Sequence, residues 1–299
     1  IIGAFMAWGI AVPYLSSVGD FPADMEYAAI ASSIWANDVR FIGAGTLAIA
    51  ALWTLLSLFK PVIEGIKMSL GALKGDTGNA ANRTEQDLSP KTILLIMIAM
   101  IIILVGTFYT FIADANLSTG FAWTLVGFSV LFAFIMGFLV AAASGYMAGL
   151  VGSSASPISG IGIVAVTIAA LLLLLVGEAG GLMDTVDGTK FATALALFTT
   201  SAVVAIACIS NDNLQDLKTG YLIHATPWRQ QVALLIGCIV GAIVIAPILD
   251  ILYQAYGFTG AMPRAGMDET QVLAAPQATL MATISSGIFS RNLEWTMII

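Results

Sequence analysis

Charged residues are scarce in this chain. Of its 299 residues, 10% are charged and 59% are hydrophobic, whereas a soluble domain carries about 25% charged residues. So few charges cannot cover a water-exposed surface, and this composition excludes a soluble globular domain. The formal net charge of −7 also argues against a nucleic-acid partner, because nucleic acids bind basic patches.

Residues that bind metals are scarce as well. The chain has one histidine, His224, and two cysteines, Cys208 and Cys238, which lie inside apolar segments without metal-ligand spacing. Neither a phosphate-binding GxxxxGK[ST] loop nor an HExxH motif is present. We therefore expect no resident metal, no cofactor and no enzymatic activity.

Long apolar runs take the place of these residues. With about 20 apolar residues per span, the sequence predicts an all-α, polytopic helical membrane protein with about seven transmembrane spans. We expect residues 16–39 to be a polar, acidic loop, and residues 277–290 to be a re-entrant hairpin or half-helix because they are too few to cross. The predicted spans cover about 1–15, 41–59, 92–113, 121–142, 161–177, 191–209 and 231–256.

Both ends of the chain lie in apolar runs, from Ile1 to a final Trp295–Ile299 stretch. We therefore expect residues 1–299 to be a single transmembrane domain that is a fragment of a longer transporter.

Basic residues predict the orientation. Residues 60–74 have an amphipathic pattern typical of a helix at the membrane interface, and a hydrophilic loop follows to residue 91. The region 60–91 and the polar segment near Lys218 together hold seven Lys and Arg, against three on the opposite side. Because positive residues favour the inner side, we expect both regions to be cytoplasmic.

A polar segment, residues 210–221, separates two of the apolar runs. If it is helical, Asn211, Gln215 and Lys218 share one face, and Asp212 and Asp216 share a neighbouring one. Polar groups at membrane depth indicate a functional site. A solvated cytoplasmic loop between two spans is the alternative interpretation.

A second feature is the charge-free stretch from Gly152 to Gly160, Gly-Ser-Ser-Ala-Ser-Pro-Ile-Ser-Gly. Proline and glycine interrupt helices, and broken helices form the substrate and ion sites of secondary transporters. A tight turn at the membrane surface is equally compatible with this composition.

These segments resemble motifs of the oligopeptide transporter (OPT) family, most closely its prokaryotic members related to the plant yellow stripe-like metal-chelate carriers. The similar segments are Asp212–Tyr221 with the following Ala225–Trp228, Ser153–Gly160, and Arg40–Gly45. Ser156 stands where the family usually has Asn, and Phe41 where it has Tyr.

The resemblance implies a secondary active transporter of a prokaryotic inner (plasma) membrane, with about twice as many spans as this chain. Family members use proton symport to import small peptides or metal-chelate complexes by alternating access. Asp212 and Asp216 are the candidates for proton coupling, since an enclosed carboxyl group can keep its proton near neutral pH. The candidates for substrate binding or translocation are Ser153, Ser154, Ser156, Pro157, Ser159, Gly160, Asn211, Asn213, Gln215 and Lys218.

Two alternatives stay open at this point. Asp216 and Lys218 can instead cap and anchor a helix end at the cytoplasmic face. The chain can also belong to a channel or be a passive membrane subunit of a larger complex. A homo-oligomer in the lipid bilayer is compatible with either function.

Overall fold

The computed structural model describes residues 1–22, 24–74, 82–115, 117–151, 158–259 and 271–293, with the backbone alone for 61, 62, 65, 66 and 68–74. The described residues form helices and no β-strand; one isolated bridge pairs Phe258 with Leu273. The helices are α1 (Ile2–Ala4), which continues through a π-helical stretch (Phe5–Ala11) into α2 (Val12–Val18), α3 (Tyr27–Ile34), a π-helical stretch (Trp35–Val39), α4 (Arg40–Lys74), α5 (Pro90–Ala113), α6 (Thr119–Val151), α7 (Ile158–Ala179), α8 (Val186–Leu222), α9 (Pro227–Ala255) and α10 (Pro276–Phe289), with short 3-10 turns at Arg83–Glu85 and Leu182–Asp184.

The prediction of an all-α polytopic membrane protein is confirmed. Within the described residues, six helices are long and apolar enough to cross a membrane, and the shorter apolar helix Ile2–Val18 corresponds to the first predicted span. α10 is one helix of 14 residues and rises about 21 Å, less than the roughly 30 Å of a hydrocarbon core. Residues 277–290 are therefore a half-helix and not a hairpin.

The predicted loop over residues 16–39 is wrong for its second half. α3 and the following π-helical stretch continue directly into α4, so a helix runs from Tyr27 to Lys74. Ile34 and Val39 are buried against Val12 of α2. The acidic residues suggested a loop, but most of them precede Tyr27, and the apolar residues that follow pack as a helix.

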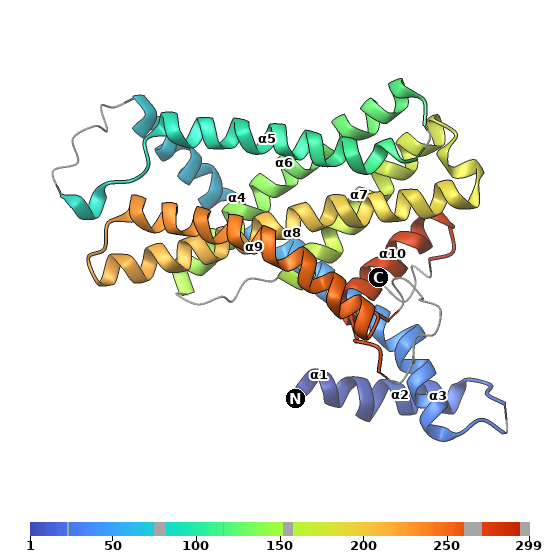
Figure 1. The fold of residues 1–299 in the computed structure, drawn as a ribbon. Coiled ribbons are helices and arrows are strands. Elements are labelled where there is room, and N and C mark those ends of the chain that lie inside the picture. The colour runs from blue at the N-terminus through green and yellow to red at the C-terminus, as the bar shows by residue number, and fades with distance from the viewer. Residues whose placement is uncertain (23, 75–81, 116, 152–157, 260–270, 294–299) are drawn as a thin grey trace.

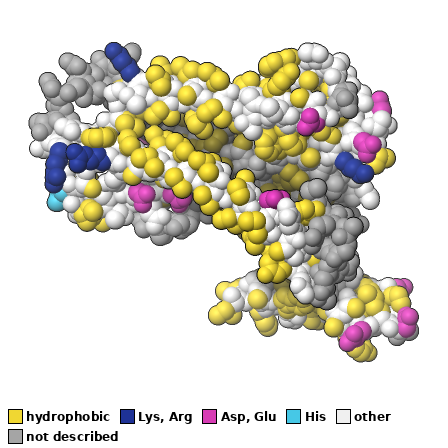
Figure 2. All heavy atoms as spheres, in the orientation of Figure 1, with side chains coloured by type: hydrophobic (Ala, Val, Ile, Leu, Met, Phe, Trp, Pro, Cys, Tyr) yellow, Lys and Arg dark blue, Asp and Glu magenta, His cyan; other side chains and the backbone are white. Residues whose placement is uncertain are grey.

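The core of the bundle is built from α6, α7, α8 and α10 (Figure 1). α7 is the most enclosed of the long helices. α5 buries only Phe108 and Ile112, and α9 has no buried residue. α1, α2 and α3 lie together at one end of the molecule, away from α5, α6, α7 and α8 and joined to them through α4 (Figure 1). Apolar side chains cover much of the face of the bundle shown in Figure 2.

α6 and α8 lie side by side and run in the same direction, because α7 returns the chain between them. Ser210 Oγ of α8 donates a hydrogen bond to the carbonyl oxygen of Ala141 in α6 (2.7 Å), a separation of 69 residues. Gly137 and Ile206, also separated by 69 residues, meet at the same interface. This offset relates positions on the two helices throughout their contact.

α7 begins well inside the span of α8. A Cβ atom on Gly162 would lie 3.5 Å from Val204 of α8 and would overlap Met281 of α10. The first turn of α7 is therefore level with about residue 207 of α8, and α8 continues to Leu222, about 22 Å further. Gln277 Nε2 of α10 donates to the carbonyl oxygen of Ser159 (3.3 Å), so α7 and α10 begin side by side.

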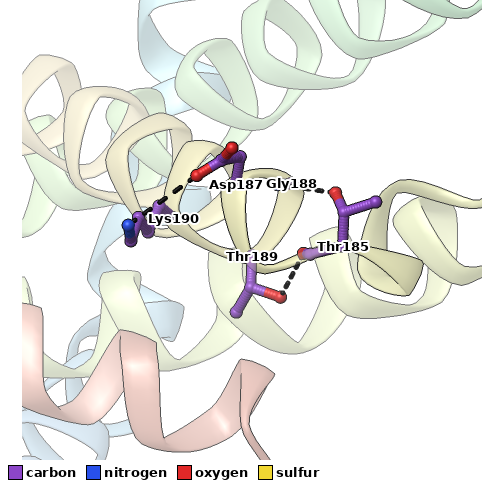
Figure 3. A network of polar contacts seen from close by, with 5 residues as sticks. All are labelled: Thr185, Asp187, Gly188, Thr189 and Lys190. Atoms are coloured by element: carbon purple, nitrogen blue, oxygen red, sulfur yellow. Dashed lines mark hydrogen bonds and ion pairs between the residues drawn. The ribbon is translucent and has the colours of Figure 1, made fainter.

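The opposite end of α8 is held by a cap (Figure 3). Thr185 Oγ1 accepts a hydrogen bond from the backbone N–H of Gly188 (3.0 Å), and Thr189 Oγ1 donates to the Thr185 carbonyl (3.1 Å). Lys190 lies 3.7 Å from Asp187 in an exposed ion pair. A capping threonine satisfies an N–H group that the first turn leaves free, so it defines where α8 starts.

Candidate functional site

The polar segment 210–221 is helical and forms the last turns of α8. The interpretation as a loop is therefore wrong, and Asn211, Gln215 and Lys218 do share one face of the helix. The Asn211 side chain is only 1% exposed. Burial falls along the segment: Asn213 and Gln215 are half-buried, and Asp212, Asp216 and Lys218 are exposed on this chain.

α6 covers one side of this polar end with small residues. A Cβ atom on Gly145 would lie 2.8 Å from Ser210 Oγ and 3.2 Å from Leu214, so the two helices approach closely there. The neighbouring Ser144 is fully buried, and its hydroxyl has no hydrogen-bond partner within the described chain. α6 carries no charged residue to its end at Val151. The polar face of α8 thus emerges beside an uncharged helix.

The second candidate segment is described only in part. Ser153, Ser154, Ser156 and Pro157 lie outside the described residues. Ser159 and Gly160 belong to the first turn of α7. A Cβ atom on Gly160 would lie 2.7 Å from the Leu47 carbonyl oxygen and 2.9 Å from the Ala51 Cβ atom of α4. Only glycine permits this approach to backbone atoms.

A junction of α4, α7 and α10 forms around this glycine. Arg40, the first residue of α4, donates to the carbonyl oxygen of Pro276 and to Thr279 Oγ1 (2.8 Å) at the start of α10. Gln277 donates to Ser159 of α7. We call these residues the helix-start junction: Arg40, Ser159, Gly160, Pro276, Gln277 and Thr279. Two of the three segments that resemble family motifs therefore meet at α10, which the sequence predicted as a re-entrant hairpin or half-helix but did not include among the candidate site residues.

The helix-start junction and the polar end of α8 offer complementary chemistry. The first N–H groups of a helix point out of its N-terminus and favour anionic groups such as carboxylates. α7 and α10 present two such ends side by side next to the guanidinium group of Arg40. Asn and Gln side chains both donate and accept hydrogen bonds. Among the described residues, no group of three or more His, Cys, Asp or Glu can hold a metal ion.

The two regions predicted to share one side of the membrane are in contact. The backbone N–H of Trp228 donates to the carbonyl oxygen of Gln86 (3.1 Å), and Gln231 binds Asp87 and the N–H of Leu88. Dark-blue Lys and Arg side chains gather at this end of the bundle in Figure 2. The structure therefore places the end of region 60–91 beside the α8–α9 connection. Its cytoplasmic location stays a prediction.

Comparison with known proteins gives a consistent result. The model of a family described as OPT oligopeptide transporter protein matches residues 1–299. A Haemophilus influenzae protein named "Putative oligopeptide transporter" is 56% identical over 299 residues, which are 100% of this chain and 47% of that protein. The chain thus spans about half the length of the curated relative that it matches. No solved structure matches it.

Proposed function

This chain belongs to the oligopeptide transporter family, and from that premise we propose that it forms part of a secondary transporter. The transporter imports small peptides or metal-chelate complexes together with protons. It works by alternating access across a prokaryotic cell membrane. The H. influenzae relative carries oligopeptide transport in its name, which supports peptides as one substrate class.

One observation carries most weight: α8 carries a polar face that begins at a buried residue inside the apolar bundle and leads out to an exposed end. Asn211 is 1% exposed, and its face leads through Gln215 to the exposed Lys218. Polar groups at membrane depth are retained where they bind or conduct something. Amide side chains suit peptides and chelates because they form hydrogen bonds to both without a fixed charge.

The candidate residues divide into two roles. Asn211, Asn213, Gln215 and Lys218 bind the substrate together with Ser159 and Gly160, and with Ser153, Ser154, Ser156 and Pro157 of the preceding segment. The starts of α7 and α10 receive a substrate carboxylate, since helix N-termini favour negative charge. Asp212 and Asp216 carry the proton on the neighbouring face of α8.

The test is uptake by the full-length protein in proteoliposomes with an imposed pH gradient, with panels of di- and tripeptides and of metal chelates. We expect saturable accumulation that collapses when a protonophore dissipates the gradient. Asp212→Asn or Asp216→Asn should abolish gradient-driven accumulation and preserve insertion and substrate exchange. Asp187→Asn, an exposed carboxylate at the other end of α8, is the matched control.

The outcomes separate this proposal from its competitor. Non-saturable flux that equilibrates without accumulation would identify a channel or a passive subunit instead. Wild-type accumulation in both aspartate variants would remove these residues from the coupling role and leave the transport function in place.

A further inference from the structure

Several buried hydroxyl groups in the core have no hydrogen-bond partner within the described chain. Their side chains are 0–1% exposed. In contrast, Thr167 and Thr193 donate to the carbonyl four residues earlier, at 2.7 and 2.9 Å. Burying an unpartnered hydroxyl is unfavourable, so these groups need an explanation. They are Ser129 and Ser144 in α6, Thr199 and Thr200 in α8, and Ser285 in α10.

Two of these hydroxyls, those of Ser129 and Thr199, belong to the parallel helices α6 and α8. The offset of 69 residues between the parallel helices places Ser129 level with Phe198 and Thr199. Thr199 lies seven residues before Ile206, on the face of α8 that meets Gly137 of α6. Ser129 and Thr199 therefore lie at the same depth.

Two more of the five hydroxyls lie at that depth on the α10 side, whereas Ser144 lies about four turns away from Ser129 along α6. Val204 of α8 and Met281 of α10 both meet Gly162 of α7. Thr200 is one turn before Val204, and Ser285 is one turn after Met281. α10 runs parallel to α7 and antiparallel to α8, so both steps lead in the same direction. Ser129, Thr199, Thr200 and Ser285 thus form one layer across three helices, which we call the hydroxyl layer.

The hydroxyl layer lies on the same side of α8 as the polar face of that helix. Thr200, Asn211, Gln215 and Lys218 follow one another at helical spacing, with the small residue Ala207 between Thr200 and Asn211. The distance from Thr200 to Lys218 is about 27 Å along the axis. The layer is therefore the inner end of a face whose outer end is exposed.

Resting on the transport function proposed above, we propose that the hydroxyl layer is a second polar site on the translocation path, closed in this conformation and hydrated in another. Because this chain already encloses each hydroxyl oxygen, an outside group can reach it only when α8 separates from α6 or α10. When α8 separates from these helices, every hydroxyl can form a hydrogen bond with water or with a substrate amide. The unpartnered hydroxyls of the closed conformation therefore favour the open one. Hydroxyls donate and accept, which suits amide groups in passage.

Cysteine accessibility tests this site. In the full-length protein with Cys208→Ala and Cys238→Ala, we would introduce Thr200→Cys or Ser285→Cys. Cells energised in the presence of a tripeptide would be treated with the charged, membrane-impermeant thiol reagent methanethiosulfonate ethyltrimethylammonium. Ala133→Cys in α6 and Ala169→Cys in α7 are matched controls, because both positions are fully buried in an apolar cluster at similar depth.

We expect the two hydroxyl-layer cysteines to react about tenfold faster than the controls, because thiolates form in water and not in an apolar core. Equal rates at all four positions would overturn the inference. Peptide uptake is measured in the same cells. Uptake with equal rates leaves the transport function in place and removes the second site, whereas fast modification without accumulation of any substrate keeps the hydrated layer and removes the transport function.

A second variant covers the case in which the cysteine proteins do not fold. Thr200→Val keeps the shape of the side chain and removes the unpartnered hydroxyl, so the closed protein should melt at a higher temperature. Uptake should fall by about tenfold, because the loss of one hydrogen bond to the passing substrate or water raises the barrier by an amount that corresponds to about that factor in rate. Thr193→Val, whose hydroxyl has a partner, should melt lower with normal uptake. A Thr200→Val protein with full uptake would contradict the proposal.

Discussion

Ser210 in α8 and Ala141 in α6 are joined by a hydrogen bond of 2.7 Å from the serine hydroxyl to the alanine carbonyl. One helical turn further along α6, Gly145 lies against the same serine. This contact places the start of the polar face of α8 beside the smallest residue available. It therefore aligns the two longest core helices and positions Asn211.

Gly145→Ala should destabilise the protein, since its Cβ atom would lie 2.8 Å from Ser210 Oγ. We expect about 1–3 kcal/mol, the usual effect of overpacking a core, measured as a lower thermal midpoint in detergent. Gly149→Ala is the control, because nothing lies within 4 Å of that position. Equal midpoints for the two variants would mean that α6 and α8 do not pack this closely.

Gly160→Ala should displace the first turn of α7 from α4. Its Cβ atom would meet the Leu47 carbonyl oxygen at 2.7 Å, and backbone yields less easily than a side chain. We expect a loss of about 1–3 kcal/mol in stability together with lower uptake. Gly43→Ala in α4 has open space around it and should preserve both, so a loss of the same size there would contradict the assignment.

Arg40→Ala should release the start of α10, because it removes the hydrogen bonds to Pro276 and Thr279. A charged hydrogen bond contributes about 1.5–3 kcal/mol to stability. Because about 1.4 kcal/mol corresponds to a tenfold change in an equilibrium constant, amide hydrogen exchange near Thr279 should accelerate by tenfold or more. Arg291→Ala removes the ion pair with Glu178 at the other end of α10. That variant should accelerate exchange near Phe289 and leave Thr279 protected.

Thr185→Ala should destabilise the start of α8, since it removes the cap drawn in Figure 3. The expected loss is about 1 kcal/mol, seen as faster hydrogen exchange over residues 186–190. Lys190→Ala removes only an exposed ion pair of the kind that contributes about 0–1 kcal/mol. A larger effect from Lys190→Ala than from Thr185→Ala would show that the ion pair, and not the cap, holds this end.

Hydropathy predicted the spans because it measures how a helix suits lipid. It ended three of them early: α4 continues past residue 59 to Lys74, α6 past residue 142 to Val151, and α8 past residue 209 to Leu222. The last turns of α6 and α8 are stabilised by contact between these two helices, such as that of Gly145 with Leu214, rather than by lipid. Within α8, the shared face of Asn211 and Gln215 was predictable because helical spacing is constant.

The rest of the site depends on contacts between distant parts of the chain. Arg40 and Pro276 are 236 residues apart, and no local pattern connects them. The hydroxyl layer is equally hidden, because serine and threonine are common in apolar helices and most of them bond their own backbone. The adjacent Thr199–Thr200 pair was visible in the sequence, but its missing partners follow from the packing of α6, α8 and α10.

α9 is tied to the rest of the described chain at both ends. Trp228, Gln231 and the close approach of Gln230 to Gly220 hold its first turn, and just past its last turn the Leu273 N–H donates to the Gly257 carbonyl oxygen (3.1 Å). Between these two ends it buries no residue. Bending of that middle stretch would therefore break no buried contact within the described chain, and the free energy of bending is set by the lipid and polypeptide around it. α9 is the part of this half that can follow its surroundings while the α6–α8 pair keeps its register.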